Sequence, residues 1–178
     1  MAPGIAQHLR RFLGTFIFLA LLSSVDMSLA DQKATFGVVK NPIEMWGAEI
    51  AVAKSSVQVA TYKFSSKEAL EALISARARG LKVTLIVDGK EAVKSDKQIT
   101  KAIKAGIDVF IWDTEQKGEL HAKFSVIDQK VLVMGSFNLS KAASKNNTES
   151  FLICHDPDLT KSAMTEFQNL LNQTVQQH

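Results

Sequence analysis

Cysteine is nearly absent from this sequence, since Cys154 is the only one among 178 residues. An intrachain disulfide is therefore excluded. Cys154 has apolar neighbours in the stretch SFLICHD, which favours a buried, inert thiol, with an intermolecular bridge as the alternative. The chain also lacks an HExxH motif, a Cys/His cluster and a packed set of carboxylates. We therefore expect it to use neither a metal ion nor a cofactor.

Long hydrophobic runs are missing as well, with one short exception near the start. The uncharged run Phe12–Val25 is shorter than the roughly 20 residues that cross a bilayer. A basic stretch, residues 8–11, precedes this run, and small residues end at Ala30. This order is typical of a secretory signal peptide. We expect residues 1–30 to be removed and residues 31–178 to be exported to the periplasm or secreted, with an uncleaved N-terminal membrane anchor as the alternative.

Strong charge of either sign is also absent, because the formal net charge is only +3. Any attraction for a polyanion must then be local. Hydrophobic residues make up 46% of the chain and charged residues 22%, and we find no internal repeat or linker. Length and composition predict one globular domain with one core.

Strand-like and helix-like segments alternate after residue 33. Strands are expected at 34–39, 57–64, 81–89 and 107–113, and helices at 42–53, 65–80 and 91–105. Ser65 and Glu68 fit a capping box at the start of the second helix. This alternation predicts parallel strand–helix–strand units with helices packed against a sheet.

The rhythm then changes. A polar loop, 114–119, precedes a hairpin of 121–127 and 131–135, which leaves no room for a helix between its strands. A further strand at 150–156 and a helix capped by Asp158, running to about Val175, complete the chain. The fold class predicted is α/β: a single domain with a mixed β-sheet flanked by helices.

The first strand of the hairpin carries polar residues that a core strand does not need. Side chains alternate between the faces of a strand, so one face would hold His121, Lys123 and Ser125, and the other Ala122, Phe124 and Val126. The apolar face suits the core, and the polar face suits a cleft in which an imidazole acts as nucleophile beside an ammonium group. Gly135 would leave backbone room for a ligand. Each residue alone also has an ordinary explanation, such as a solvated or edge-strand position.

Together these residues fit a known pattern. The spacing H-x-K-x4-D-x6-G-S-x-N resembles the signature of the phospholipase D superfamily, and it is met by His121, Lys123, Asp128, Gly135, Ser136 and Asn138. A chance match at these fixed positions has a probability on the order of 10⁻⁶. The N-x-E element of the family fits Asn147 and Glu149. The chain has one copy of the motif where larger phospholipases have two, so it is most similar to the small exported bacterial endonucleases of the superfamily, which work as homodimers.

The resemblance implies a phospholipase D-like fold and a metal-free reaction. His121 would attack phosphorus and form a phosphohistidine, and the partner protomer's His121 would protonate the leaving group. Lys123 and Asn138 would bind the non-bridging oxygens, with assistance from Ser136. Glu149 would orient His121.

Four further residues have open roles. Asp128 belongs to the motif but lies seven residues from His121 across a turn, so we favour a structural role such as a salt bridge. Lys63, Lys141 and Lys145 would line a groove for a polyanionic backbone, although each is equally well explained as a solvated lysine.

The sequence therefore predicts a phospholipase D-like catalytic domain over 31–178. We expect a metal-independent phosphodiesterase, first of all a non-specific endonuclease that acts on nucleic acid, DNA rather than RNA, as a homodimer. A phospholipase D-type hydrolase of phospholipids is the main alternative, against which stands the lack of an apolar loop after residue 30. A non-catalytic nucleic-acid-binding module is the other alternative, but such a module would need no nucleophile.

Overall fold

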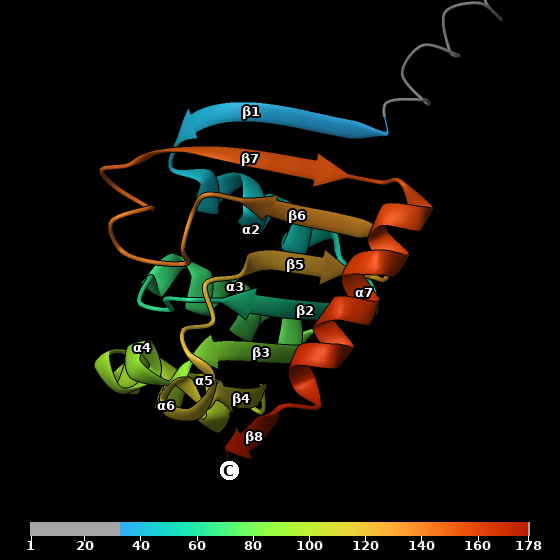
Figure 1. Ribbon diagram of the computed structural model, residues 1–178. Coiled ribbons are helices and arrows are strands. Elements are labelled where there is room, and N and C mark those ends of the chain that lie inside the picture. Colours follow the sequence, from blue (N-terminus) through green and yellow to red (C-terminus); the bar gives the residue numbers. More distant parts are fainter. Residues whose placement is uncertain (1–32, 178) are drawn as a thin grey trace, which may run out of the picture. The chain divides into compact units, whose positions relative to one another are not determined.

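The computed structural model describes residues 33–177 (Figure 1). The predicted signal peptide lies outside the described residues. The strands are β1 (Ala34–Lys40), β2 (Ser56–Thr61), β3 (Lys82–Asp88), β4 (Asp108–Trp112), β5 (Lys123–Ile127), β6 (Val131–Gly135), β7 (Thr148–Cys154) and β8 (Thr174–Gln177). The helices are α2 (Pro42–Val52), α3 (Lys67–Ala78), α4 (Gly89–Lys94), α5 (Asp96–Lys104), α6 (Thr114–Lys117) and α7 (Pro157–Leu171). Within the described range, none of these helices combines the length and the apolar character that crossing a membrane requires.

All of the strands join one mixed sheet in the order β1-β7-β6-β5-β2-β3-β4-β8. The pairs β2–β3 and β3–β4 are parallel, and the other neighbours are antiparallel. The predicted fold class is thus confirmed. The first strand does not form the expected parallel strand–helix–strand unit with β2. Both sides of β2 are occupied by β3 and β5, and β1 pairs antiparallel with β7 at the margin of the sheet.

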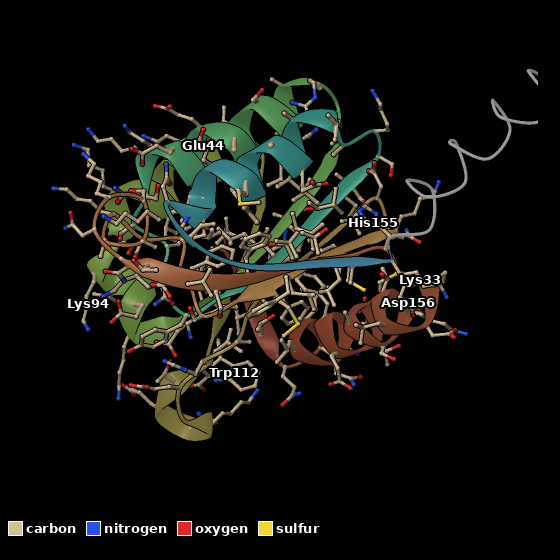
Figure 2. All side chains as sticks on the ribbon, turned by 90° about the horizontal axis from the view of Figure 1, so that it is seen from above. Lys33, Glu44, Lys94, Trp112, His155 and Asp156 are labelled. Carbon is tan, nitrogen blue, oxygen red and sulfur yellow. The ribbon has the colours of Figure 1, made fainter. Side chains whose placement is uncertain are left out.

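Helices cover both faces of the sheet. Figure 2 shows α2 and α3 on one face and α7 on the other. The larger core lies under α2, α3 and α5, where Trp46 and Leu73 pack against Val83 and Leu85 of β3. Phe167 of α7 is fully buried against the opposite face. Cys154 lies under α7 as well, so the expected buried thiol is confirmed and its burial speaks against an intermolecular bridge.

Helix ends differ from the sequence prediction by short steps that follow from capping. Ser66, not Ser65, caps α3, because the Ser66 hydroxyl accepts a hydrogen bond from the Ala69 N–H at 3.1 Å. Asp156, not Asp158, caps α7 through the N–H groups of the first turn. In both cases a neighbouring residue of the same chemical type satisfies the free N–H groups.

Three segments were assigned incorrectly. The helix expected at 91–105 is two helices, since Asp88 starts α4 and the chain breaks at Ser95 before α5. The expected loop 114–119 contains the short helix α6. The last helix ends at Leu171, and the chain then forms β8, which pairs with β4 and so covers that edge of the sheet.

Asp128 sits in the turn between β5 and β6 and fastens it to the end of α2. Its carboxylate accepts hydrogen bonds from the N–H groups of Lys54, Ser55 and Ser56 at 2.7–3.0 Å and from the Ser55 hydroxyl at 2.9 Å. Although burial alone would raise the pKa of Asp128, these bonds lower it from 3.8 to about 2. The expected structural role therefore rests on backbone hydrogen bonds rather than on a salt bridge.

This anchor predicts a pH-dependent contribution to stability. The folded-state pKa is depressed, so the contribution is present above pH 3.8 and is lost as the pH falls toward about 2. Asp128→Asn should lower the free energy of unfolding by about 1–2 kcal/mol at pH 7, allowing for solvent screening. Urea unfolding at pH 7 and pH 2.5 measures the difference, with Asp108→Asn in β4 as the charge-matched control. An Asp128→Asn effect of equal size at both pH values would contradict this role.

Candidate active site

His121 and Lys123 lie at the edge of the sheet where the parallel strands end. Because β5 is antiparallel to β2, its first residues stand beside the last residues of β2, and Lys123 pairs with Thr61. The exposed His121 precedes β5 by two residues, and Lys123 is half-buried. Figure 1 shows α4 and α6 at this same edge. The two side chains are therefore presented at a rim rather than in the middle of the sheet.

The ammonium group of Lys123 is held against His121. Its Nζ lies 3.2 Å from His121 Nδ1 and donates to the His121 carbonyl oxygen at 2.8 Å. Burial lowers the pKa of Lys123, and the charge of Glu149 partly offsets this effect. A cation fixed beside an imidazole can stabilise negative charge on a group that the imidazole attacks.

The predicted division of β5 into a core face and a cleft face is only partly right. Helices lie over both faces of the strand, and the hydroxyl of the buried Ser125 accepts a hydrogen bond from the Trp46 indole N–H at 2.8 Å. Ser125 is thus part of the packing under α2. Only the two polar residues ahead of it remain at the open rim.

Ser136, Asn147 and Glu149 form a second group beside this rim. The Ser136 hydroxyl donates to the Glu149 carboxylate and accepts from the Ser150 N–H at 3.1 Å. The Asn147 amide donates to the other carboxylate oxygen at 2.8 Å. Glu149 was expected to orient His121, but the hydrogen bonds recorded for its carboxylate in the described chain go to Ser136 and Asn147. The reason is positional: Glu149 is the second residue of β7, and β6 lies between β7 and β5.

Gly135 lines the same open groove as His121 and Lys123, as predicted, and it also lets β7 come close. A Cβ at this position would lie 2.1 Å from the Ser150 carbonyl oxygen and 2.9 Å from Cδ1 of Phe137. The space that a Cβ would take is therefore filled by β7 and by the Phe137 ring. A side chain here would force β6 and β7 apart.

An open groove of about 790 Å³ extends from His121 and Lys123 to Ser136 of the second group. His121, Lys123, Ser136 and Asn138 line one part of it, and the partly exposed Met134 and Leu159 line another. The Asn138 Oδ1 is buried and has no hydrogen-bond partner in the described part of the chain. A buried acceptor without a partner is unusual, so this amide has capacity left for a ligand.

The other predicted residues lie outside this groove. Asp128 is at the opposite end of β5 from His121, about 20 Å away at the rise of an extended strand. Lys63 forms an ion pair with Glu91 at 3.2 Å. Lys141 and Lys145 are exposed on the segment that follows Asn138.

Comparison with known proteins decides the family. The family model described as "Cardiolipin synthase, PLD-like domain" matches residues 47–171. The chain belongs to the phospholipase D superfamily. A phospholipase D of Rickettsia conorii is 35% identical over 124 residues, which cover 70% of this chain and 60% of that protein. The mitochondrial cardiolipin hydrolase of Mus musculus is 32% identical over 121 residues, covering 68% and 54%.

Solved structures share the fold of this superfamily member. Nuc from Salmonella typhimurium, a phospholipase D family member, aligns with a TM-score of 0.76 at 24% identity and covers 82% of this chain and 97% of that one. NucT from Helicobacter pylori aligns with a TM-score of 0.69 at 26% identity, covering 82% and 99%. By contrast, the chain spans only about 54–60% of the two curated relatives named above.

Tyr62 is a residue of the site that the sequence did not reveal. Its ring lies 4.9 Å from the His121 ring, centroid to centroid, and the Lys123 ammonium lies 5.7 Å from its centre. Partial burial, with the charges of Glu119 and Glu91, raises the pKa of Tyr62, so its hydroxyl stays protonated. Tyr62 therefore packs against both motif side chains in this superfamily member. The motif spacing could not locate it, since it follows β2 and lies far from the motif in the sequence.

We expect Tyr62 to contribute through the packing of its ring and not through its hydroxyl. Tyr62→Phe should keep kcat on bis(4-nitrophenyl) phosphate, while Tyr62→Leu should lower kcat about 3- to 10-fold, the size of one aromatic contact. Tyr62→Leu should also change the pH profile of kcat/KM, because the surroundings of His121 and Lys123 change, with little effect on KM. Equal losses in the two variants would show instead that the hydroxyl acts.

Proposed function

We propose that this protein is a metal-independent phosphodiesterase, first of all a nucleic acid endonuclease, whose active site is shared by two copies of the chain. One observation carries the proposal: His121, Lys123, Ser136 and Asn138 line one groove, and they provide one imidazole where the reaction needs two. The structural likeness to Nuc and NucT along nearly their full lengths supports the comparison with small one-motif proteins.

The chemistry follows from these groups. A neutral His121 attacks phosphorus, so that a P–N bond forms and the P–O bond to the leaving alcohol breaks. The protonated His121 of the partner gives its proton to that oxygen. It then takes a proton from water, which attacks phosphorus and breaks the P–N bond. The products are an alcohol and a phosphate monoester, and both imidazoles return to their starting forms.

Positive charge for the phosphoryl oxygens comes from Lys123, which is already fixed beside His121. Asn138 adds an amide whose oxygen has no internal partner. Across residues 33–177, no group of three or more His, Cys, Asp or Glu side chains is placed to hold a metal ion. Two lysines, one from each copy, would carry the charge that an ion supplies in other phosphodiesterases.

Exposed apolar side chains beside the groove support pairing of two chains. Phe36, Leu152, Met134 and Phe124 follow one another across four adjacent strands. The exposed fraction is 70% for Phe36 and 41% for Met134, and Leu159 of α7 is 44% exposed. We expect an isologous contact through this row, through the motif hairpin and through residues 114–119 and 139–149, which adjoin the site in sequence. Such a contact would set each His121 near its copy.

Hydrolysis of a phospholipid is the second candidate. The wall of the groove formed by Met134 and Leu159 is apolar and begins beside His121, so it could hold part of an acyl chain. The names of the curated relatives point the same way. Export through the predicted signal peptide remains part of the proposal, and an uncleaved anchor would favour the lipid substrate.

Activity in chelator separates a lysine-based mechanism from a metal-based one. Plasmid cleavage should persist in excess EDTA and disappear in His121→Ala. Lys123→Ala or Asn138→Ala should each lower the rate roughly 10²-fold, as for one preorganised donor. The control is His155→Ala, an exposed histidine drawn at the other end of the sheet in Figure 2. Loss of cleavage in EDTA, restored by Mg²⁺, would sink the mechanism.

Mixed dimers test the shared site. A dimer of wild-type and His121→Ala chains holds one imidazole, so it has a nucleophile but no proton donor and should be severely impaired. Exchange of subunits should then lower activity below simple dilution, while exchange with His155→Ala chains should not. A fully active monomer by light scattering at the assay concentration would be incompatible with the proposal.

A further inference from the structure

Two lysines at the active-site edge are held by one buried carboxylate. Glu91, whose exposed fraction is only 1%, lies 3.2 Å from Lys63 Nζ and 2.6 Å from Lys94 Nζ. Asp88 places this glutamate, because its side chain caps α4 and accepts a hydrogen bond from the Glu91 N–H at 3.2 Å. A solvated surface lysine needs no buried carboxylate as a partner, so the burial of Glu91 beside two lysines calls for an explanation.

The cluster turns its ammonium groups toward solvent and keeps its carboxylate buried. Burial alone would raise the pKa of Glu91, but a hydrogen bond from Lys94 and the charge of Lys63 lower it, so the carboxylate stays ionised. Two ammonium groups then face one carboxylate. The side chains of Lys63 and Lys94 are 40% and 66% exposed. An ammonium group has three donors, so each lysine can bind Glu91 and still offer N–H groups outward.

The cluster adjoins the catalytic groups through Tyr62. The pairing of β2 with β5 ends at Thr61 and Lys123, so Lys63 and His121 both lie just beyond the same end of this pair of strands. The Tyr62 ring packs on His121, and the charges of both Glu91 and Lys94 shift the pKa of the Tyr62 hydroxyl. Tyr62 thus connects the cluster of Lys63, Lys94 and Glu91 with the reacting groups.

Two other acids lie near the cluster, so the two lysines are distinguished by their exposure and not by a net positive charge. The Asp88 carboxylate is buried and accepts from the N–H groups of Lys90, Glu91 and Leu120 and from the Thr114 hydroxyl. Glu119 also acts on Lys94, but it is exposed, so salt and water screen its charge.

We propose that Lys63 and Lys94, positioned by Glu91, bind a phosphate next to the scissile one on a nucleic acid strand. This subsite rests on the proposed nuclease function and deepens it. A polynucleotide always offers a second phosphate one nucleotide away, whereas a simple phosphodiester offers none. The subsite therefore acts on length and on salt dependence, not on the bond-breaking step.

Salt dependence of kcat/KM on a single-stranded 12-mer measures the contact. The double variant Lys63→Gln/Lys94→Gln should reduce the slope of log kcat/KM against log salt by about 0.7, the value for one single-strand phosphate. It should also lose about tenfold more kcat/KM on the 12-mer than on bis(4-nitrophenyl) phosphate, as for one charge-assisted contact. The matched control is Lys82→Gln/Lys101→Gln, which removes the same charge from exposed lysines away from this edge.

A triple variant separates a folding defect from the loss of phosphate binding, and the comparison of two substrates separates the subsite from the nuclease function. Adding Glu91→Gln to the double variant removes the buried carboxylate left without partners, and this triple variant should fold and keep the reduced slope. A slope equal to that of the control overturns the subsite while the nuclease function stands. Equal losses on the two substrates overturn it too, since the lysines would then act on the reacting phosphate. A wild-type protein that hydrolyses the chromogenic ester but no nucleic acid overturns the proposed function itself.

Discussion

The antiparallel pairing of β5 with β2 is the constraint on which the site depends. The parallel strands β2, β3 and β4 end at one edge of the sheet, and β5 begins there only because it runs the opposite way. The register that pairs Thr61 with Lys123 brings the motif beside Tyr62 and Lys63. A slip by one residue would turn His121 and Lys123 to the other face. Asp128 resists such a slip from the far end of the strand, where it is bonded to the backbone after α2.

Much of this arrangement could be predicted from local signals. Alternating hydrophobicity located β1 to β7, and the motif spacing located the residues that line the groove. Features that depend on tertiary contacts could not be predicted. Gly135 lines the groove as expected, but its close approach to Ser150 and Phe137 from adjoining segments could not be read from the motif. The strand β8 was missed because its four residues are defined by pairing with β4 rather than by their own pattern.

The choice of side-chain partners was the hardest part to predict. The family resemblance implies that Glu149 orients His121. In the described residues, the Glu149 carboxylate accepts hydrogen bonds from Ser136 and Asn147. Lys63 looked like a free cation, yet it shares the buried Glu91 with Lys94. In both cases the partner comes from another strand or helix, and spacing along one segment carries no information about it. Sequence reasoning therefore located the motif residues at the groove better than the side-chain partners of Glu149 and Lys63.

The groove itself combines a polar end with an apolar wall, and this combination is why substrate and assembly are linked. If a second chain covers the row from Phe36 to Met134, little apolar surface is left for an acyl chain, and a charged strand is the substrate that fits. If the row stays uncovered, a lipid has room. The number of chains at the site thus decides the substrate class as well as the source of the second imidazole.

The central claim is that His121 forms the covalent intermediate at a site with one nucleophile for two chains. Rapid acid or base quench during turnover of a phosphorus-labelled oligonucleotide, followed by mass spectrometry of the peptides, tests it directly. The account predicts a phosphoramidate on the peptide that contains His121, stable in base and labile in acid, at no more than one label per two chains. A label on another residue, or one on every His121, would contradict it.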